Sequence, residues 1–234
     1  MPASILSGFP LGNSSRLSLT LKLSLMYGDS YWSYVQPWGP YAQGAAPYLD
    51  AAIDWARITG LKVIIDLHGA PKSQNGFDHS GHKAAYPAWG DADSLRYTHA
   101  TLKQIETKYA VPAMQDVIVA IQFLNEPFLQ KIDKDMVRQF YRDAFFNLRQ
   151  ISDTPAMLHD GFLDPSWMNG FLTPQDNNAQ GVVVDHHEYQ IFGDSIGLSV
   201  EGHLDLTCNS VQFPGPSPSP VPLPLTKAQP GRLL

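Results

Sequence analysis

The sequence predicts an α/β fold in which strands and helices alternate around a parallel sheet. Residues 117–124 form a near-continuous apolar run with β-branched positions, which is typical of a strand buried on both faces. Similar strand candidates occur at 61–67, 155–160 and 181–189, and segments with helical spacing of apolar residues lie among them. The order strand, helix, strand, helix indicates βα units.

The N-terminal part contains one strand candidate, one loop and one helix candidate. Residues 17–25 alternate leucine with Ser, Thr or Lys, which predicts a half-buried strand, although a low-complexity accident would give the same pattern. Residues 28–47 are rich in Gly, Pro and aromatic residues and are interpreted as a loop that could offer a binding surface. Residues 48–59 follow helical spacing between Pro47, which suits a first turn, and Gly60, which suits a stop.

The next segments contain the longest loop. Residues 61–67 predict a short buried strand that ends at His68, and the loop runs from 69 to 90. Loops longer than about 15 residues in compact domains are usually functional. Residues 92–109 predict the second helix.

The clearest helix follows the 117–124 strand. It spans residues 133–151, with Asp133 as its cap and a broad stripe of apolar and aromatic residues that is typical of a core-facing helix. Residues 155–160 and 181–189 predict two further strands, and 195–209 a last helix.

The composition changes after Asn209. Proline occupies every second position from Pro214 to Pro224, a density that neither a helix nor a sheet accepts. We therefore expect residues 210–234 to form a disordered Pro-rich tail, with a proline-rich ligand segment as the alternative. The expected domain boundaries are a divergent N-terminal segment at 1–30, the α/β part at 31–209 and the tail at 210–234.

Composition and charge narrow the function classes. An apolar fraction of 44% describes a globular protein, and a net charge of −6 without a basic stripe argues against a nucleic-acid partner. No apolar run approaches the ~20 residues of a transmembrane helix. Residues 1–10 contain no Lys or Arg and give no convincing secretory signal. We expect a monomer that uses no cofactor and no metal.

Polar side chains stand at the ends of four consecutive predicted strands. They are His68, then Asn125 and Glu126, then His159 and Asp160, and finally Asp185, His187 and Tyr189, which share one face of their strand. A lone glutamate at a strand end is more often the first solvated residue of a loop. In a barrel, however, the carboxyl ends of the strands carry the chemistry, so the whole set predicts one polar pocket.

Four motifs resemble the fungal exo-β-1,3-glucanases of glycoside hydrolase family 5. The motifs are Leu67-His68-Gly69-Ala70-Pro71, Ser73-Gln74-Asn75-Gly76-Phe77-Asp78, Leu124-Asn125-Glu126-Pro127 and Asp185-His186-His187-Glu188-Tyr189-Gln190. They occur in the family's order. The resemblance implies a partial TIM (β/α)8 barrel, roughly strands three to six of eight, over residues 31–209. It also implies hydrolysis of β-1,3-glucan with retention of configuration, outside the cell or in the cell wall.

The resemblance also assigns roles to individual residues. Glu126 would be the general acid/base, and Phe77 and Phe192 would grip the next sugar along. The residues that would surround the glucose at the cleavage point are His68, Asp78, Asn125, His187 and Tyr189. Retaining hydrolysis needs a second carboxylate, the nucleophile, about 5 to 5.5 Å from the acid.

The chain departs from the family pattern in two places that matter. Residues 17–29 replace a family strand that carries an arginine, and no Gly-Glu-Trp segment supplies the family's nucleophile. Neither Glu188 nor Glu201 stands in a matching context. We therefore expect little or no hydrolysis of laminarin and an exposed sheet edge. The alternative function is a catalytically inactive glucan-binding remnant or an incomplete gene product.

A metal hydrolase is the third alternative. His79 and His82 flank Ser80-Gly81, but no His-Glu-x-x-His pattern accompanies them. A solvent-exposed loop is the simpler interpretation of this pair.

Overall fold

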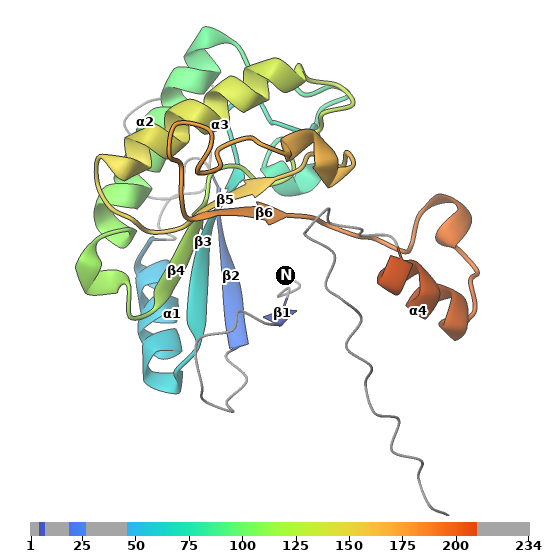
Figure 1. Ribbon diagram of the computed structural model, residues 1–234, viewed down its shortest axis with the longest axis horizontal. Coiled ribbons are helices and arrows are strands. Elements are labelled where there is room, and N and C mark those ends of the chain that lie inside the picture. The colour runs from blue at the N-terminus through green and yellow to red at the C-terminus, as the bar shows by residue number, and fades with distance from the viewer. Residues whose placement is uncertain (1–4, 8–18, 27–45, 210–234) are drawn as a thin grey trace, which may run out of the picture. The chain divides into compact units, whose positions relative to one another are not determined.

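The computed structural model describes residues 5–7, 19–26 and 46–209 (Figure 1). They belong to two compact units, the first ending at His187 and the second beginning at Glu188. The predicted loop at 28–47 lies almost wholly outside the described residues, and the predicted tail at 210–234 lies entirely outside them.

The first unit is built on a sheet whose strands follow one another in sequence order. These are β1 (Ile5–Ser7), β2 (Leu19–Met26), β3 (Lys62–Gly69), β4 (Ile118–Gln122), β5 (Ala156–His159) and β6 (Val182–Asp185). β1 pairs antiparallel with β2, and all later neighbours are parallel. The leucine alternation is therefore a real strand, because β2 pairs with β3 over nearly its whole length.

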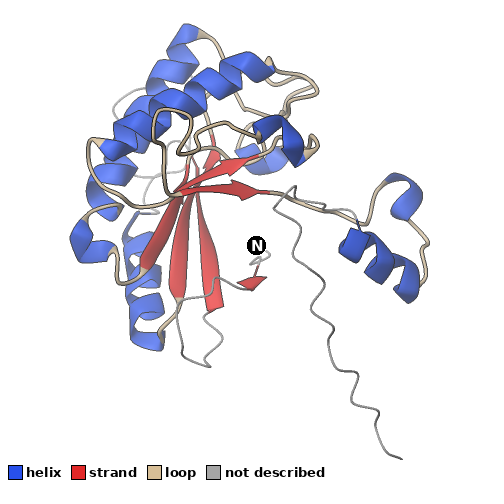
Figure 2. Ribbon diagram, viewed as in Figure 1, coloured by secondary structure: helices blue, strands red, loops and turns tan. Residues whose placement is uncertain are grey.

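Three helices cover one face of this sheet, as Figure 2 shows in blue. They are α1 (Ala46–Thr59), α2 (Ala92–Tyr109) and α3 (Lys134–Arg149). The predicted cap is confirmed, since the Asp133 carboxylate accepts the Met136 N–H at 2.7 Å. The helices and the outward side chains of β3, β4 and β5 form one hydrophobic cluster. Burial of this apolar face stabilises the βα units.

Two predicted strands are shorter in the structure than the sequence indicated. β4 ends at Gln122 instead of residue 124, and β6 ends at Asp185 instead of residue 189. For β6 the reason is the length of its neighbour, because β5 ends at His159, which pairs with Asp185. The expected open edge is present, since no strand in the described part of the chain pairs with the outer side of β6.

The second unit contains α4 (Val200–Asn209), which is shorter than the helix predicted at 195–209. Gly197 has φ +91, which ends the preceding turn and prevents an earlier helix start. The Ser199 hydroxyl then accepts the Gly202 N–H at 3.1 Å. Across the described residues, no helix has both the length and the apolar character that a membrane span requires.

The inward face of the sheet has two layers of side chains. Ile64, Ala120 and Met157 form a small apolar cluster against which Val183 packs. Two residues further along each strand come Asp66, Gln122, His159 and Asp185, all buried. An apolar floor therefore supports a polar layer at the carboxyl ends of the strands, where barrel enzymes carry their sites.

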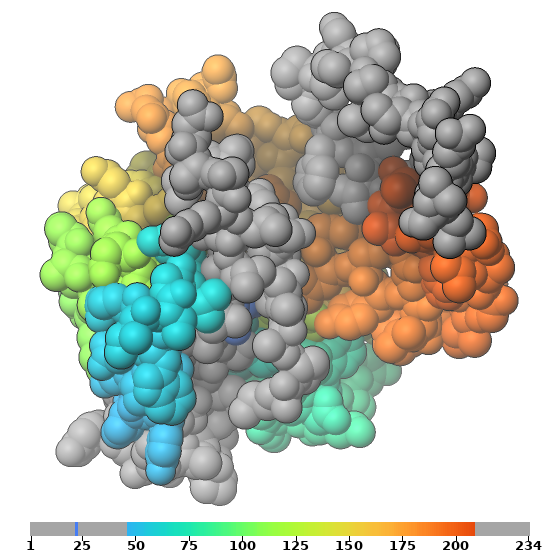
Figure 3. Space-filling model, turned by 90° about the horizontal axis from the view of Figure 1, so that it is seen from below, coloured from blue at the N-terminus to red at the C-terminus, as the bar shows by residue number. Residues whose placement is uncertain are grey.

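The outer side of α1 is apolar and exposed. Tyr48, Trp55 and Ile58 are exposed by 78%, 66% and 82%. Figure 3 shows this helix, in cyan, as part of the visible surface of the first unit. Large apolar side chains at this density are unusual on a solvated helix face.

Glu106 is a buried carboxyl on α2 and gives the first testable prediction. Neither carboxyl oxygen has a hydrogen-bond partner among the described residues, and burial raises the pKa of Glu106 from 4.5 to about 8. The unfolded chain therefore loses this proton at lower pH than the folded chain. The stability associated with Glu106 is complete below the unfolded pKa and is lost as the pH rises towards 8.

Glu106→Gln should remove this loss. Urea unfolding between about pH 5 and pH 8 should show a pH-dependent decrease in stability that is smaller by about 2–4 kcal/mol than in the unmodified protein. Asp135→Asn, at an exposed carboxylate on α3, is the control and should leave the decrease unchanged. An unchanged decrease in Glu106→Gln would contradict the assignment.

Candidate functional site

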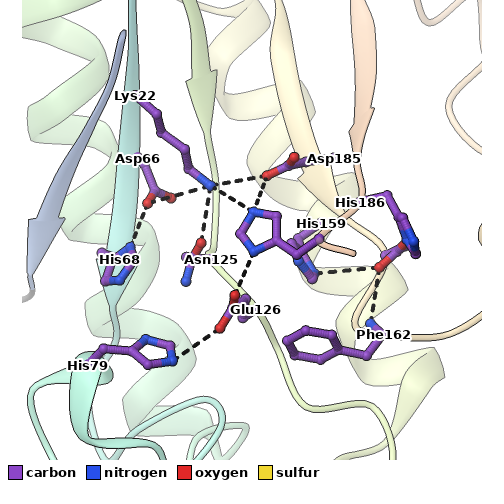
Figure 4. Close-up of polar contacts among 12 residues, drawn as sticks. Lys22, Asp66, His68, His79, Asn125, Glu126, His159, Phe162, Asp185 and His186 are labelled. Atoms are coloured by element: carbon purple, nitrogen blue, oxygen red, sulfur yellow. Dashed lines mark hydrogen bonds and ion pairs between the residues drawn. The ribbon is translucent and has the colours of Figure 1, made fainter. Parts of the chain in front are cut away.

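Glu126 lies just beyond the end of β4 and is 4% exposed. Its backbone has φ 47, in the left-handed region that costs a non-glycine residue free energy and is common at functional sites. His187 Nδ1 donates to Glu126 Oε1 at 2.5 Å, and His79 Nε2 lies 3.2 Å from Oε2. Each carboxylate oxygen thus has its own imidazole partner, as Figure 4 shows.

These partners set the charge state of the pair. Burial acts to raise the pKa of Glu126, but the hydrogen bonds from His187 and His79 outweigh it and hold the pKa well below its usual range. Burial acts to lower the pKa of His187, but its hydrogen bonds to Asp185 and Glu126 raise it to about 9. The resting arrangement is therefore an ionised carboxylate beside a protonated imidazole.

Lys22 reaches the same cluster from β2. Its side chain is 5% exposed, and its ammonium lies 3.0 Å from Asp185 Oδ2 and 3.9 Å from Asp66 Oδ2. It also donates to Asn125 Oδ1 at 3.1 Å. Burial acts to raise the pKa of Asp185, but His187 and Lys22 hold it well below its usual range. A buried ammonium therefore neutralises part of the negative charge of the polar layer.

The His68 ring is oriented by Asp66, two residues earlier on the same strand. The Asp66 carboxylate lies 2.8 Å from His68 Nδ1 and can accept a hydrogen bond from it, so Nε2 points away from this contact. The ring is 22% exposed, and its centroid lies 5.3 Å from that of His79. A carboxylate that fixes the tautomer of a histidine is a common arrangement at catalytic and binding sites.

The loop after β3 is attached to the end of β4 by Gln74. The buried Gln74 amide donates to the backbone oxygens of His68 at 2.9 Å and Asn125 at 2.8 Å, and its oxygen accepts the Ala70 N–H. The same loop carries Phe77, whose ring lies 5.5 Å from that of His79. Gln74 therefore links the loop side chains to the strand that positions Glu126.

His159 and Asp160 at the end of β5 have separate roles. Asp160 forms an ion pair with His186 and accepts the Phe162 N–H at 3.0 Å. His159 lies with its ring edge-on to His187, the centroids 4.5 Å apart, and burial lowers its pKa to about 3. Asp160 thus stabilises the local chain, and His159 is a neutral neighbour of the Glu126 pair.

Glu126, His159 and His187 have ligand atoms within 4.8 Å of one another, which is close enough for a metal ion. The hydrogen bonds do not fit this use. His159 Nδ1 accepts the Gly161 N–H at 2.9 Å, so the proton of the neutral ring sits on Nε2. His187 Nδ1 lies 2.5 Å from Glu126, and its Nε2 lies 3.1 Å from Asp185 and 3.3 Å from the Lys22 ammonium. Both nitrogens of His187 and Nδ1 of His159 are therefore already engaged in hydrogen bonds, which an ion would have to displace.

The structure brings four of the predicted site residues into one polar cluster: His68, Asn125, Glu126 and His187. Phe77 and the exposed Asp78 lie on the adjoining loop. Tyr189 and Phe192 belong to the second unit, where their ring centroids are 6.1 Å apart. Their place around a sugar stays a prediction.

Two contributors differ from the sequence interpretation. His79 lies on the loop as expected and its side chain is 40% exposed, but its Nε2 is 3.2 Å from Glu126, a contact that the loop interpretation did not include; His82 is exposed. Loop residues have no periodicity that would reveal such a contact. Lys22 is not among the predicted site residues, because a half-buried strand is expected to turn its polar face to solvent. Its place between Leu21 and Leu23 was the available signal, because adjacent residues of a strand point to opposite faces and only one face of the strand can carry the leucines.

The family of this chain follows from a match to a family model. The model for cellulase (glycosyl hydrolase family 5) matches residues 25–201. The chain belongs to glycosyl hydrolase family 5. Curated relatives named glucan 1,3-beta-glucosidase include two from fungi. One, from Blumeria graminis, is 40% identical over 77% of this chain. The other, from Yarrowia lipolytica, is 35% identical over 76% of it. This chain spans 42% and 43% of their lengths.

A solved structure supports the fold of this family 5 chain. Rutinosidase from Aspergillus niger matches with a TM-score of 0.64 at 20% identity, over 75% of this chain and 52% of that one. At this identity the likeness concerns the fold alone. The predicted partial TIM barrel is confirmed by the family match and the five successive parallel strands.

Proposed function

We propose that this chain carries the acid/base half of a retaining glucan 1,3-β-glucosidase site, with Glu126 as the proton donor and acceptor. The observation that carries the proposal is the buried Glu126 carboxylate at a barrel strand end, held by one imidazole on each oxygen. A glycosidase acid/base must keep one oxygen aimed at the glycosidic bond through two proton transfers. Two partners on different strands and loops provide such a fixed orientation.

The substrate in this proposal is a β-1,3-glucan. Its support is the name of the relatives from Blumeria graminis and Yarrowia lipolytica. The sugar would be surrounded by His68, Asp78, Asn125, His187 and Tyr189, with Phe77 and Phe192 on the next sugar unit. We further propose that the protein acts as a monomer, outside the cell or in the cell wall.

Binding without turnover is the second candidate, and the charge state of the site favours it. A general acid must hold a proton, whereas hydrogen bonds keep Glu126 ionised. The neighbouring carboxylate of Asp185 is engaged by Lys22 and His187 rather than exposed to a sugar carbon. The resting site is therefore better suited to hold a neutral polyhydroxylated ligand than to cleave it.

Calorimetric titration with laminaritriose tests the proposal, with cellotriose for comparison. We expect binding of the β-1,3-linked sugar and a preference over the β-1,4-linked one. Any release of glucose should show the β-anomer first by NMR, because a retaining reaction preserves configuration. Equal or absent binding of both sugars would reject the proposed substrate.

Glu126→Gln separates the acid/base role from binding. The neutral amide keeps the size of the side chain but cannot transfer a proton, so residual hydrolysis of laminaritriose should fall to background. The dissociation constant should stay within about threefold, since the amide still contacts both imidazoles. Glu201→Gln on α4, at an exposed residue, is the control and should change neither value. Unchanged hydrolysis in Glu126→Gln would exclude Glu126 as the acid/base.

A further inference from the structure

The backbone of Asn125 is held by hydrogen bonds on both sides of its side chain. Its backbone N–H donates to the Leu67 oxygen at 3.0 Å, and its backbone oxygen accepts from Gln74 at 2.8 Å. The residue is fully buried. The amide therefore has little freedom except rotation about its own last bond, which would exchange the places of oxygen and nitrogen.

Contact with Lys22 selects one of these two orientations of the Asn125 amide. Its ammonium lies 3.1 Å from the amide, and an ammonium can donate hydrogen bonds but cannot accept them. The amide atom that faces Lys22 must be the oxygen, because the alternative would place N–H groups against N–H groups. Figure 4 shows the oxygen of Asn125 toward Lys22 and its nitrogen turned away.

The orientation leaves a donor to be satisfied. Asn125 Nδ2 is buried and has no hydrogen-bond partner among the described residues. An unpaired buried donor costs free energy, so a site that keeps one gains affinity for a ligand that supplies an acceptor. The next residue, Glu126, carries a carboxylate that can only accept when ionised. A hydroxyl group can accept a hydrogen bond from Asn125 Nδ2 and donate one to a carboxylate, so a hydroxyl suits a ligand at this position.

The ammonium is itself held in place. Asp185 Oδ2 lies 3.0 Å and Asp66 Oδ2 3.9 Å from Lys22 Nζ, and the side chains of these carboxylates are 6% and 0% exposed. Both belong to the polar layer of the inward face, on β6 and β3. The orienting group is therefore built into the sheet, not supplied by a surface side chain.

We propose that Lys22 is a positioning residue that fixes the Asn125 amide in one orientation and so presents its N–H donors to a hydroxyl oxygen of the bound sugar. The inference rests on the proposed function for the identity of the ligand. It assigns Lys22 no contact with the sugar, because its effect is transmitted through Asn125.

The contact between Lys22 and Asn125 is tested first, in the unmodified protein and without a sugar. With 15N-labelled lysine, the buried Lys22 ammonium should give an NMR signal protected from exchange with water. Lys22→Arg should remove this signal, which assigns it, and Asn125→Ala should shift it. A Lys22 ammonium that exchanges as fast as the exposed Lys103, or a signal unmoved by Asn125→Ala, would overturn the proposal.

Binding of laminaritriose then tests the consequence. The glutamine side chain in Lys22→Gln can both donate and accept hydrogen bonds, so the Asn125 amide can adopt either orientation. The affinity for laminaritriose should therefore fall about three- to tenfold. The arginine side chain in Lys22→Arg can only donate hydrogen bonds, so this variant should bind laminaritriose more tightly than Lys22→Gln does. In the Asn125→Ala background, Lys22→Gln should have no further effect. Lys103→Gln, at an exposed lysine of α2, is the control and should bind as the unmodified protein does.

Each result decides a specific point. An equal loss of affinity in Lys22→Gln with and without Asn125 would show that Lys22 acts by another route and would overturn the proposal. Unchanged affinity in Lys22→Gln would do the same. If the unmodified protein bound no laminaritriose, the proposed function would be rejected, and so would the proposal that the ligand of Asn125 is a sugar. The ammonium signal would still decide whether Lys22 fixes the amide.

Discussion

Hydrolysis of laminarin by the purified chain is expected to be several orders of magnitude slower than hydrolysis by a retaining glycosidase whose acid/base and nucleophile carboxylates are both in place. Loss of one member of a catalytic unit typically costs about 10³ to 10⁶ in rate. In the described part of the chain, Glu126 is ionised, and Asp185 is engaged by Lys22 and His187. Among the described residues, neither of these two carboxylates is therefore ready to act as acid or nucleophile.

Reducing-sugar release over a range of pH gives the measurement. Because the pKa of Glu126 is held below its usual range, the small residual rate should increase as the pH is lowered, until the protein unfolds. Rapid hydrolysis near neutral pH that disappears in Glu126→Gln would contradict the expectation. Such a result would show that a second carboxylate completes the pair.

Replacement of Lys22 by methionine is expected to destabilise the fold by about 3 kcal/mol, since it removes one partner of a buried ion pair while His187 and Gln122 still contact Asp185. The methionine fills a similar volume but leaves Asp185 and Asp66 without the ammonium between them. The free energy of unfolding from urea titration at neutral pH measures the effect.

Two comparisons identify the source of that loss. Lys103→Met on α2 removes an exposed positive charge and should change stability by less than about 0.5 kcal/mol. Lowering the pH should reduce the difference between Lys22→Met and the unmodified protein, because protonation of Asp185 removes the charge that needs a partner. A loss below about 1 kcal/mol would mean that the polar layer tolerates its charge without Lys22.

Local sequence patterns predicted much of the fold, because burial on one face sets their period. α2 lies at residues 92–109 as expected, and the Asp133 cap places the start of α3 correctly. Strand ends were less predictable. The length of β6 depends on β5, which lies more than twenty residues earlier, and no local pattern in residues 181–189 records where that neighbour ends.

The site was predictable where it follows strands and not where it depends on long-range pairing. His68, Asn125, Glu126 and His187 were expected together because parallel strands bring their carboxyl ends to one edge. The contact of Lys22 with Asp185 joins residues 163 positions apart. It follows from the parallel pairing of β2 with β3, which the leucine alternation alone could not establish.

The position of Gln74 gives the loop after β3 an unusual mechanical property. One amide side chain bonds the end of β3, the start of the loop and the segment beyond β4, while the Gln74 backbone oxygen accepts the Phe128 N–H. The loop therefore cannot swing as a hinged flap without breaking several buried bonds at once. Phe77 and His79 follow Gln74 closely in this anchored loop, so we expect the shape of the rim to be largely preformed before a ligand binds.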